Sequence, residues 1–153
     1  LVVTQQARPE LLEQVQAAYA ETGVQSEIAA FFDDLPSRLS DAHLLVCRAG
    51  ASTVAELTTA GRPAILVPYP HAVDDHQTAN AHALDSAGGG WLIPQPGFTV
   101  EALTARLSEL FNSPSALTAA AVCAARAGRP DAAERLADMV EDLIGTNGEK
   151  EAA

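Results

Sequence analysis

Small side chains dominate residues 48–53 (RAGAST), directly after the apolar run HLLVC at residues 43–47. If a helix begins there, its first backbone N–H groups have no partner within the helix and carry about half a positive charge. Such a helix start suits a phosphate or the polar face of a sugar, and small side chains let the ligand reach the backbone. The segment therefore predicts a ligand site at the start of a helix.

Two roles compete for the carboxylate of Glu56, which follows this segment. Thr53 and Glu56 fit the S/T-x-x-E capping box, in which the glutamate only satisfies a backbone N–H. A carboxylate can also accept both hydroxyls of a ribose, as acidic residues do in other nucleotide sites. If the helix begins at Gly50 or Ala51, Glu56 lies a turn inside it and the capping role disappears.

A second polar cluster follows the apolar run AILVP at residues 64–68. On a helix, the spacing of His76, Gln77 and Asn80 places them on one side. Their imidazole and amide groups can form directional hydrogen bonds with sugar hydroxyls without adding a fixed charge. The alternative is that Asp75 caps the helix and the other side chains are solvated.

The stretch FFDD at residues 31–34 ends a further strand-like segment. Its rings could border a flat base while the backbone N–H and C=O pair with the edge of that base. A place in the core is expected more for Phe31 than for Phe32. Asp33 and Asp34 resemble a phosphoacceptor or metal-binding pair only superficially, and the leucine and proline that follow favour a cap or turn before a short helix.

The histidines do not predict a metal site. His71, His76 and His82 are five and six residues apart, which matches no i, i+4 pair of ligands. Asp74 and Asp75 lie among them, but no second cluster supports this group.

The apolar pattern alternates between short strands and helices. Strands are predicted at residues 1–4, 25–31, 43–47, 64–68 and 90–93. Helices are predicted at residues 9–22, 51–60, 76–87 and 99–112, followed by Ala-rich helices at 115–127 and 130–144. This alternation predicts right-handed βαβ crossovers and an α/β fold with a doubly wound parallel sheet. Ligands of such sheets bind beyond the carboxyl ends of the strands. The polar segments at residues 31–34, 48–53 and 76–80 each follow a predicted strand, so we expect them at that edge.

The composition indicates one acidic domain. The 153 residues carry a formal net charge of −11, and the last 23 hold seven acids against Arg135 and Lys150. This negative charge repels phosphate groups, which argues against binding of nucleic acid and against docking of this part on anionic lipid. We expect a domain over residues 1–144 and a flexible acidic tail over residues 145–153.

The cysteines and the ends of the chain add two expectations. Cys47 and Cys123 have no metal-site or redox spacing, which favours reduced, buried thiols and a cytoplasmic location. The apolar runs are far shorter than the ~20 residues of a membrane span. Because the chain opens in a strand-like run without an initiator methionine, we expect a fragment of a longer polypeptide.

The ordered segments FFDDL, VCRAGASTVAELTTAGRPAILVPYP and DDHQTANA resemble the C-terminal, donor-binding half of glycosyltransferase family 28, whose members have the two-domain GT-B fold. The resemblance covers nearly the whole chain. It implies UDP-N-acetylglucosamine (UDP-GlcNAc) as donor and no tightly bound cofactor or metal. The family reaction transfers GlcNAc with inversion to a lipid-linked N-acetylmuramoyl-pentapeptide, lipid I, which yields lipid II for peptidoglycan. It also implies a peripheral position on the cytoplasmic face of the bacterial inner membrane.

The resemblance assigns roles to individual positions. It implies that the backbone of Phe32 contacts uracil, that residues 51–53 line the phosphate and sugar, and that Glu56 holds the ribose hydroxyls. His76 and Gln77 are implied to face the sugar, with Asn80 at a nearby polar position. The full set of predicted substrate-binding residues is Phe32, Ala51, Ser52, Thr53, Val54, Ala55, Glu56, His76, Gln77 and Asn80.

The chain departs from the family pattern in several places. Many relatives have Arg-Ser-Gly where this chain has Arg-Ala-Gly at residues 48–50, and His76 replaces a glutamine found in some members. The glycine-rich, histidine-containing loop of the acceptor half and the phosphate loop expected before the first strand are both missing from this sequence. No catalytic residue is therefore predicted, and the general base and the acceptor site are expected from a missing N-terminal half.

The sequence accordingly predicts a chain that binds UDP-GlcNAc weakly and transfers nothing by itself. Two other readings stay open. One is a stand-alone donor-binding subunit of a split glycosyltransferase, and the other is an enzyme like UDP-GlcNAc 2-epimerase, which shares the GT-B architecture. The sequence leaves the oligomeric state undetermined.

Overall fold

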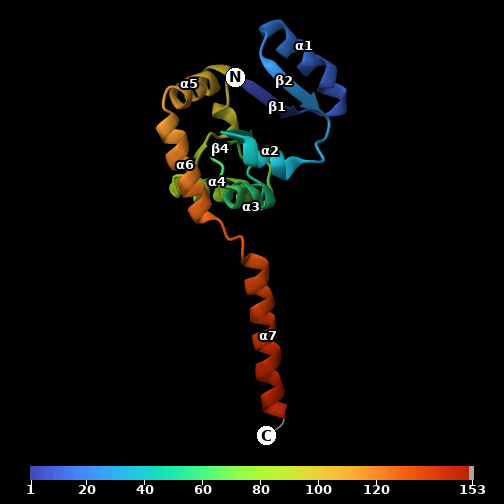
Figure 1. The fold of residues 1–153 in the computed structure, drawn as a ribbon, viewed down its shortest axis with the longest axis vertical. Helices are drawn as coiled ribbons and strands as arrows, with labels where there is room; N and C mark the ends of the chain where they lie inside the picture. The colour runs from blue at the N-terminus through green and yellow to red at the C-terminus, as the bar shows by residue number, and fades with distance from the viewer. Residues whose placement is uncertain (152–153) are drawn as a thin grey trace. The chain divides into compact units, whose positions relative to one another are not determined.

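The structure, a computed structural model, describes residues 1–151, without the side chains of residue 73 and of residues 145–151. It consists of two compact units, Leu1–Arg38 and a second unit from Leu39 onward (Figure 1). Each unit is described by itself.

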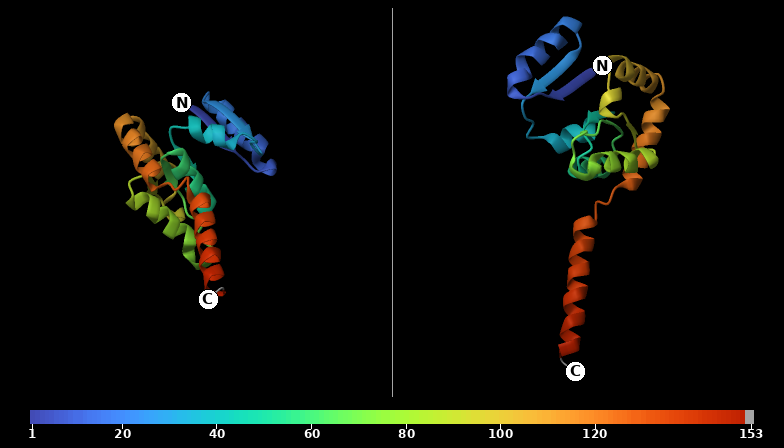
Figure 2. Two further views of the ribbon diagram at one scale, coloured as in Figure 1. Left: turned by 60° about the horizontal axis from the view of Figure 1, so that its bottom comes forward. Right: turned by 180° about the vertical axis from the view of Figure 1, so that it is seen from behind.

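The first unit is a βαβ element in which two parallel strands are joined by a helix that packs on the second strand (Figures 1 and 2). Its elements are β1 (Val2–Gln6), the 3-10 turn η1 (Pro9–Leu11), α1 (Leu12–Thr22) and β2 (Gln25–Ala29). Gly23 ends α1 in the left-handed conformation, φ 68°, which a residue without Cβ adopts at little cost. Helix α2 (Leu35–Asp41) follows β2 and leads out of this unit.

The second unit contains a parallel sheet with the strand order β3-β4-β5. Its elements up to the last strand are β3 (Leu45–Cys47), α3 (Ala51–Ala60), β4 (Ala64–Leu66), η2 (Val73–Asp75), α4 (His76–Ser86) and β5 (Gly90–Leu92). Leu45 is in register with Ala64, which is in register with Gly90. Because neighbouring strands are parallel, the connections that follow β3 and β4 emerge at the same edge of the sheet.

The core of this unit lies between the sheet and the two crossover helices, α3 and α4, which contact each other, and it also includes Ala124 of the later helix α6 (Pro114–Ala127). All three residues of β4 are buried, as expected for a central strand of a parallel sheet. Leu57 of α3 and Leu84 of α4 are likewise inaccessible to solvent. This packing holds the start of α3 and the start of α4 at one end of the sheet.

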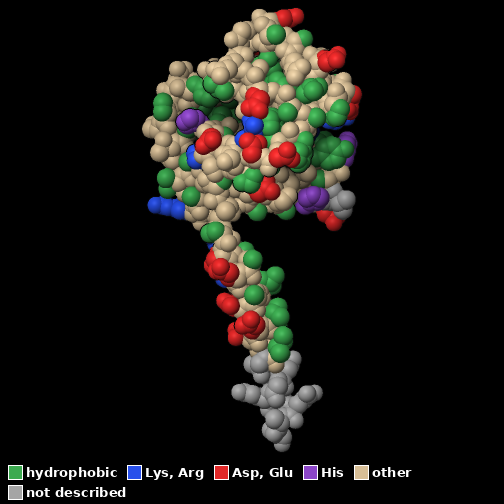
Figure 3. Space-filling view, turned by 45° about the vertical axis from the view of Figure 1, so that its right-hand side comes forward, with side chains coloured by type: hydrophobic (Ala, Val, Ile, Leu, Met, Phe, Trp, Pro, Cys, Tyr) green, Lys and Arg blue, Asp and Glu red, His purple; other side chains and the backbone are tan. Residues whose placement is uncertain are grey.

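The remaining elements are helical apart from one 3-10 turn. They are η3 (Gln95–Gly97), α5 (Val100–Phe111), α6 (Pro114–Ala127) and α7 (Ala132–Glu151). Helix α7 exposes an apolar stripe formed by Leu136, Met139, Val140, Leu143 and Ile144, and Figure 3 shows acidic side chains along another side of this helix. Within residues 1–151, no helix has both the length and the apolar character that crossing a membrane requires.

The observed elements agree with the predicted alternation of strands and helices. The helix predicted at residues 51–60 has the same bounds in the structure, whereas the strand predicted at 43–47 is shorter, Leu45–Cys47. The backbone of α7 continues to Glu151, so residues 145–151 of the predicted tail are helical. Residues 152–153 lie outside the described part, and both the single domain over residues 1–144 and the flexibility of the tail stay predictions.

We predict that Gly90→Ala destabilises the chain by about 1 to 3 kcal/mol, because overpacking a filled site forces the backbone to shift. A Cβ atom at Gly90 would lie 2.7 Å from the carbonyl oxygen of Ala64 on the neighbouring strand. Urea unfolding followed by circular dichroism would measure the change. Gly97→Ala is the matched control, since a Cβ there meets only the Cγ2 of Ile93 at 4.0 Å. Equal effects of the two substitutions would contradict the prediction.

Candidate functional site

The amino end of α3 presents unpaired backbone donors. The helix begins at Ala51, with Gly50 as the preceding cap residue and no side chain that accepts a hydrogen bond there. The first bond of the helix runs from the N–H of Val54 to the carbonyl oxygen of Gly50 at 2.9 Å. The N–H groups of residues 51–53 precede this bond, so they need acceptors from outside the helix.

Neither the backbone conformation nor the packing of this chain requires a glycine at position 50. Its φ of −61° and ψ of 150° are open to any residue. A Cβ atom added there would meet only the Oγ1 of Thr53, at an ordinary contact distance of 3.6 Å. The space in front of the helix is therefore left open by the fold, as the small residues of the segment predict.

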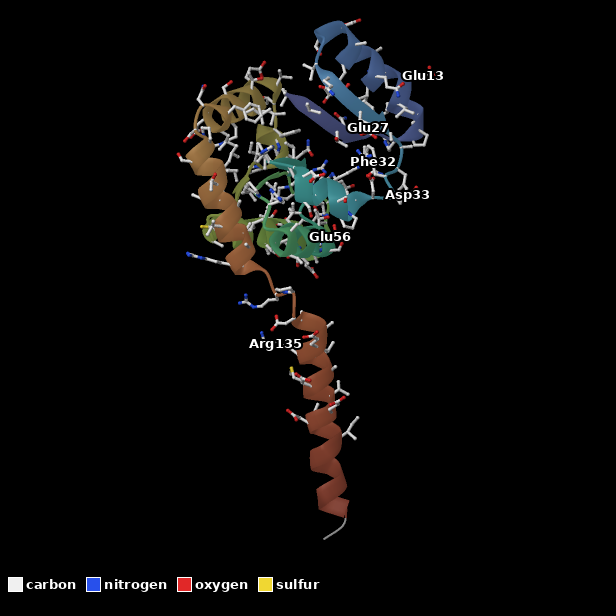
Figure 4. All side chains as sticks on the ribbon, in the orientation of Figure 1. Glu13, Glu27, Phe32, Asp33, Glu56 and Arg135 are labelled. Atoms are coloured by element: carbon white, nitrogen blue, oxygen red, sulfur yellow. The ribbon has the colours of Figure 1, made fainter. Side chains whose placement is uncertain are left out.

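The start of α3 at Ala51 excludes the capping box for Glu56. The helix begins two residues before Thr53, so Glu56 lies more than a turn inside it. Its side chain is exposed and makes no hydrogen bond or ion pair with any residue that the structure describes (Figure 4). Ser52 and Glu56 share one side of the helix, about 6 Å apart along its axis. The carboxylate is thus available to a ligand that extends from the helix tip.

Two side chains tie the connection after β3 to the connection after β4. The Nη1 of Arg48 donates to the carbonyl oxygens of Val67 and Pro68, both at 3.1 Å. In the other direction, the Nδ2 of Asn80 on α4 donates to the carbonyl oxygen of Ala49 at 3.0 Å. The two connections are therefore held as one surface.

Gln77 adds a bond within the second connection. The backbone N–H of Tyr69 donates to the Oε1 of Gln77 at 2.9 Å. Because this bond uses the oxygen, the amide nitrogen of Gln77 keeps its two hydrogens for other acceptors. His76, the first residue of α4, is exposed. The structure thus places His76, Gln77 and Asn80 at the start of α4 in the unit that also carries α3.

A strained turn leads into α4. Asp74 and Asp75 both have left-handed backbone, with φ of 51° and 52°. Non-glycine residues in this region cost free energy, although aspartate tolerates it better than most residues. The side chain of Asp75 accepts a hydrogen bond from the hydroxyl of Thr78 at 2.6 Å and caps no backbone N–H. The alternative in which Asp75 caps the helix through its side chain is therefore wrong.

A groove of about 350 Å³ runs between α3 and α4 beside the helix tip. It is lined mainly by small and apolar side chains, and its wall includes Ala51, Val54, Ala55 and Asn80 of the predicted set. Glu56, His76 and Gln77 do not line it. The structure thus brings the predicted residues of α3 and α4 to one region, of which the groove is one part.

Phe32 belongs to the first unit and is described apart from these residues. Phe31 is 71% exposed, so the expectation that a core place suits Phe31 more than Phe32 is wrong. Phe32 is half-buried, with the guanidinium of Arg38 at 4.1 Å from the centre of its ring. Asp33 and Asp34 form a turn before α2, as predicted.

Arg38 forms a charged network around this turn. It donates from Nη1 and Nη2 to the two carboxylate oxygens of Glu27 at 2.7 and 2.9 Å, and from Nε to Asp34 at 2.6 Å. These hydrogen bonds lower the pKa of both carboxyl groups. A lowered pKa in the folded state means that the network stabilises at neutral pH and that this contribution is lost as the pH falls through the acidic range.

Sequence reasoning missed Arg48 and Arg38 as residues that organise the site. Arg48 could have been noticed as a lone cation directly after a buried strand, and Arg38 through its i, i+4 spacing from Asp34. Neither signal names the partner that matters, since the carbonyls of residues 67–68 and the carboxylate of Glu27 are distant in sequence.

The cysteines and possible metal ligands complete the description. Cys47 and Cys123 are free and half-buried, and burial raises the pKa of the Cys47 thiol to about 11, so it stays protonated at neutral pH. Among the side chains that the structure describes, up to residue 144, no group of three or more His, Cys, Asp or Glu gathers in an arrangement that could hold a metal ion.

Comparisons with known proteins point to one family. The model of the Glycosyltransferase family 28 C-terminal domain matches residues 1–136. A relative from Paramagnetospirillum magneticum, named UDP-N-acetylglucosamine--N-acetylmuramyl-(pentapeptide) pyrophosphoryl-undecaprenol N-acetylglucosamine transferase, is 62% identical over 142 residues. The match covers 93% of this chain and 38% of that relative, so the chain spans well under half of the relative's length.

Solved structures agree in fold. The crystal structure of MurG from Acinetobacter baumannii superposes with a TM-score of 0.86 at 37% identity, over 93% of this chain and 41% of that one. The spinosyn forosaminyltransferase SpnP superposes with a TM-score of 0.61 at 19% identity, over 94% of this chain and 43% of that one, which is a likeness of fold alone. The predicted α/β fold of a GT-B C-terminal half is confirmed.

We predict that Asn80→Ala destabilises the chain by about 1 to 3 kcal/mol, because it leaves a buried carbonyl oxygen without its donor. Ala49, which carries that oxygen, is inaccessible to solvent. Urea unfolding would measure the loss. Asn112→Ala is the matched control at an exposed position after α5, where we expect a change within about 0.5 kcal/mol. A loss at Asn80 as small as that at Asn112 would refute the tie between the two connections.

Proposed function

The chain belongs to the Glycosyltransferase family 28 C-terminal domain family, and on this premise we propose that it binds UDP-GlcNAc as the donor half of a glycosyltransferase. The named relative carries both the donor sugar and a lipid-linked acceptor in its name. The single observation that supports donor binding most is the open tip of α3, where the N–H groups of residues 51–53 precede the first bond of the helix.

The diphosphate is the part of the donor that this tip suits. Its negative charge meets the backbone donors of residues 51–53 and the positive end of the helix dipole. The whole chain has a formal net charge of −11, so binding an anion depends on a local arrangement of this kind. Gly50 leaves the approach open, and Arg48 with Asn80 keeps the approach in place.

Residues of α3 and α4 hold the ribose and the sugar, and the family resemblance implies a contact to uracil from the first unit. Glu56, on the side of α3 that Ser52 shares, accepts hydrogen bonds from the ribose hydroxyls. The amide nitrogen of Gln77 donates to the sugar, with His76 and Asn80 beside it at the start of α4. The backbone of Phe32, in the first unit, pairs with the edge of uracil.

Transfer itself requires partners from outside this chain. When an acceptor hydroxyl attacks the anomeric carbon with inversion, the bond to the diphosphate breaks and negative charge grows on the leaving group. The preorganised N–H groups at the tip of α3 stabilise that charge more in the transition state than in the ground state, which is how binding becomes catalysis. The general base and the site for the lipid-linked N-acetylmuramoyl-pentapeptide come from the rest of the protein.

The proposed setting is peptidoglycan synthesis. The full protein acts as a peripheral enzyme at the cytoplasmic face of the bacterial inner membrane, where the lipid-linked acceptor is presented. The 153-residue chain by itself binds the donor and transfers nothing.

We predict that Glu56→Gln weakens binding of UDP-GlcNAc to this chain by about 1 to 3 kcal/mol, because a charged acceptor for the ribose hydroxyls is lost. This corresponds to a dissociation constant roughly 5- to 150-fold higher. Isothermal titration calorimetry on the two chains would measure it. Glu13→Gln, in the first turn of α1, is the matched control and should bind as the unmodified chain does. If both variants bind equally well, Glu56 does not hold the ribose.

A second prediction concerns the helix tip. Ala51→Pro removes one N–H that has no partner in the helix, and proline is well tolerated at the first helical position. The ψ of 150° at Gly50 suits a residue before proline. We expect the melting temperature to stay the same or rise slightly, while affinity for both UDP and UDP-GlcNAc falls roughly tenfold, as for one charge-assisted hydrogen bond.

The same calorimetric titration, paired with thermal unfolding, checks this prediction. Val100→Pro at the first residue of α5, an exposed position after Thr99 with ψ of 165°, is the control for a proline at a helix start and should leave UDP affinity unchanged. Unaltered UDP affinity in the folded Ala51→Pro chain would place the diphosphate elsewhere.

A further inference from the structure

The backbone of Phe32 lies outside the regular elements and keeps part of its hydrogen-bonding capacity. It lies in the connection of residues 30–34, between the end of β2 and the start of α2. Its N–H makes no hydrogen bond with any residue that the structure describes, and its C=O opens the turn at Asp33 and Asp34, which leaves one lone pair of that oxygen for a ligand. A peptide of this kind can recognise a base edge only if something in addition to its one main-chain bond holds it still.

Arg38 contacts a residue before this connection, one within it and one at its end. Glu27, which precedes the connection on β2, is held by two parallel hydrogen bonds of 2.7 and 2.9 Å, and Asp34, at its end, by one of 2.6 Å. Between them, the guanidinium lies 4.1 Å from the centre of the Phe32 ring. Figure 4 shows Glu27 on β2 and Phe32 in the segment that follows it.

This arrangement contributes more to geometry than to stability. The side chains of Glu27 and Asp34 are 58% and 55% exposed, and ion pairs that water reaches contribute little to folding. A guanidinium nevertheless has a rigid, planar set of donors, so its forked bond and its stacking on an aromatic ring restrict orientation. The peptide of Phe32 is therefore fixed through the side chain of Arg38.

We propose that Arg38 is a positioning residue that sets the base selectivity of the donor site by fixing the peptide of Phe32; this rests on the proposed function. Uracil presents a donor at N3 and an acceptor at O4, whereas cytosine presents an acceptor at N3 and a donor at its 4-amino group. A fixed peptide matches one of these patterns. A loosened peptide reorients and accepts either, so selectivity falls more than affinity does.

The test measures the affinities of this chain for UDP and for CDP by calorimetry. The unmodified chain should prefer UDP, and Arg38→Gln should lower the ratio of the two affinities roughly tenfold, the effect of about one well-placed hydrogen bond. Arg38→Lys keeps the charge without the fork and should restore part of the ratio. Arg106→Gln breaks the ion pair with Glu109 on α5 and is the matched control, with an unchanged ratio.

The double variant Glu27→Gln with Asp34→Asn provides a second route, because it removes the charged acceptors and leaves Arg38 in place. A lowered ratio in this variant supports the proposal even if Arg38→Gln does not fold. An unchanged ratio in a folded variant, even one with a lower melting temperature, means that Arg38 is only structural and overturns the proposal. If the unmodified chain binds no UDP, the proposed donor site fails as well; if UDP binding depends on Glu56 but its selectivity ignores Arg38, this inference alone fails.

Discussion

The candidate site depends on hydrogen bonds that cross between the connections after β3 and β4. Each of these strands has three residues, so the main-chain ladder ends soon and leaves carbonyl groups beyond it. Arg48 satisfies two of them from one connection, and Asn80 satisfies another from α4. Because burying a carbonyl without a donor costs free energy, these bonds hold the connections after β3 and β4 in one arrangement. The open tip of α3 is useful only because that arrangement keeps it accessible.

The acidity of the chain explains the kind of donors that the proposed site uses. A surface with a formal net charge of −11 gives a phosphate no long-range attraction. Backbone N–H groups at a helix tip act at contact distance, and they need no mobile cation to be ordered beforehand. The amides of Gln77 and Asn80 likewise supply direction without charge. Arg48, the cation beside the tip, is engaged with carbonyl oxygens, where it organises the main chain.

Polar and charged contacts hold the first unit to a greater extent than they hold the second. Among its described residues, Ala7 is the only buried hydrophobic side chain, so packing contributes less here than around β4. The turn after β2 is instead held by the charges around Arg38 and by its contact with Phe32. A peptide that is fixed in this way stays open to a ligand, because its N–H is not used to hold it and its C=O keeps a second lone pair.

The sequence by itself determined the succession of strands and helices and the family. The spacing of apolar residues and the positions of glycine and proline act on the nearby chain. The helix Ala51–Ala60 was therefore predicted with its observed bounds, and Gly61 ends it in the left-handed conformation. Tertiary structure alone decided the exposure of Phe31 and the bond from Asn80 to a carbonyl 31 residues away. Spacing along one element states which side chains share a side, but the partner of a polar group is set by how distant segments pack, and no local pattern contains that information.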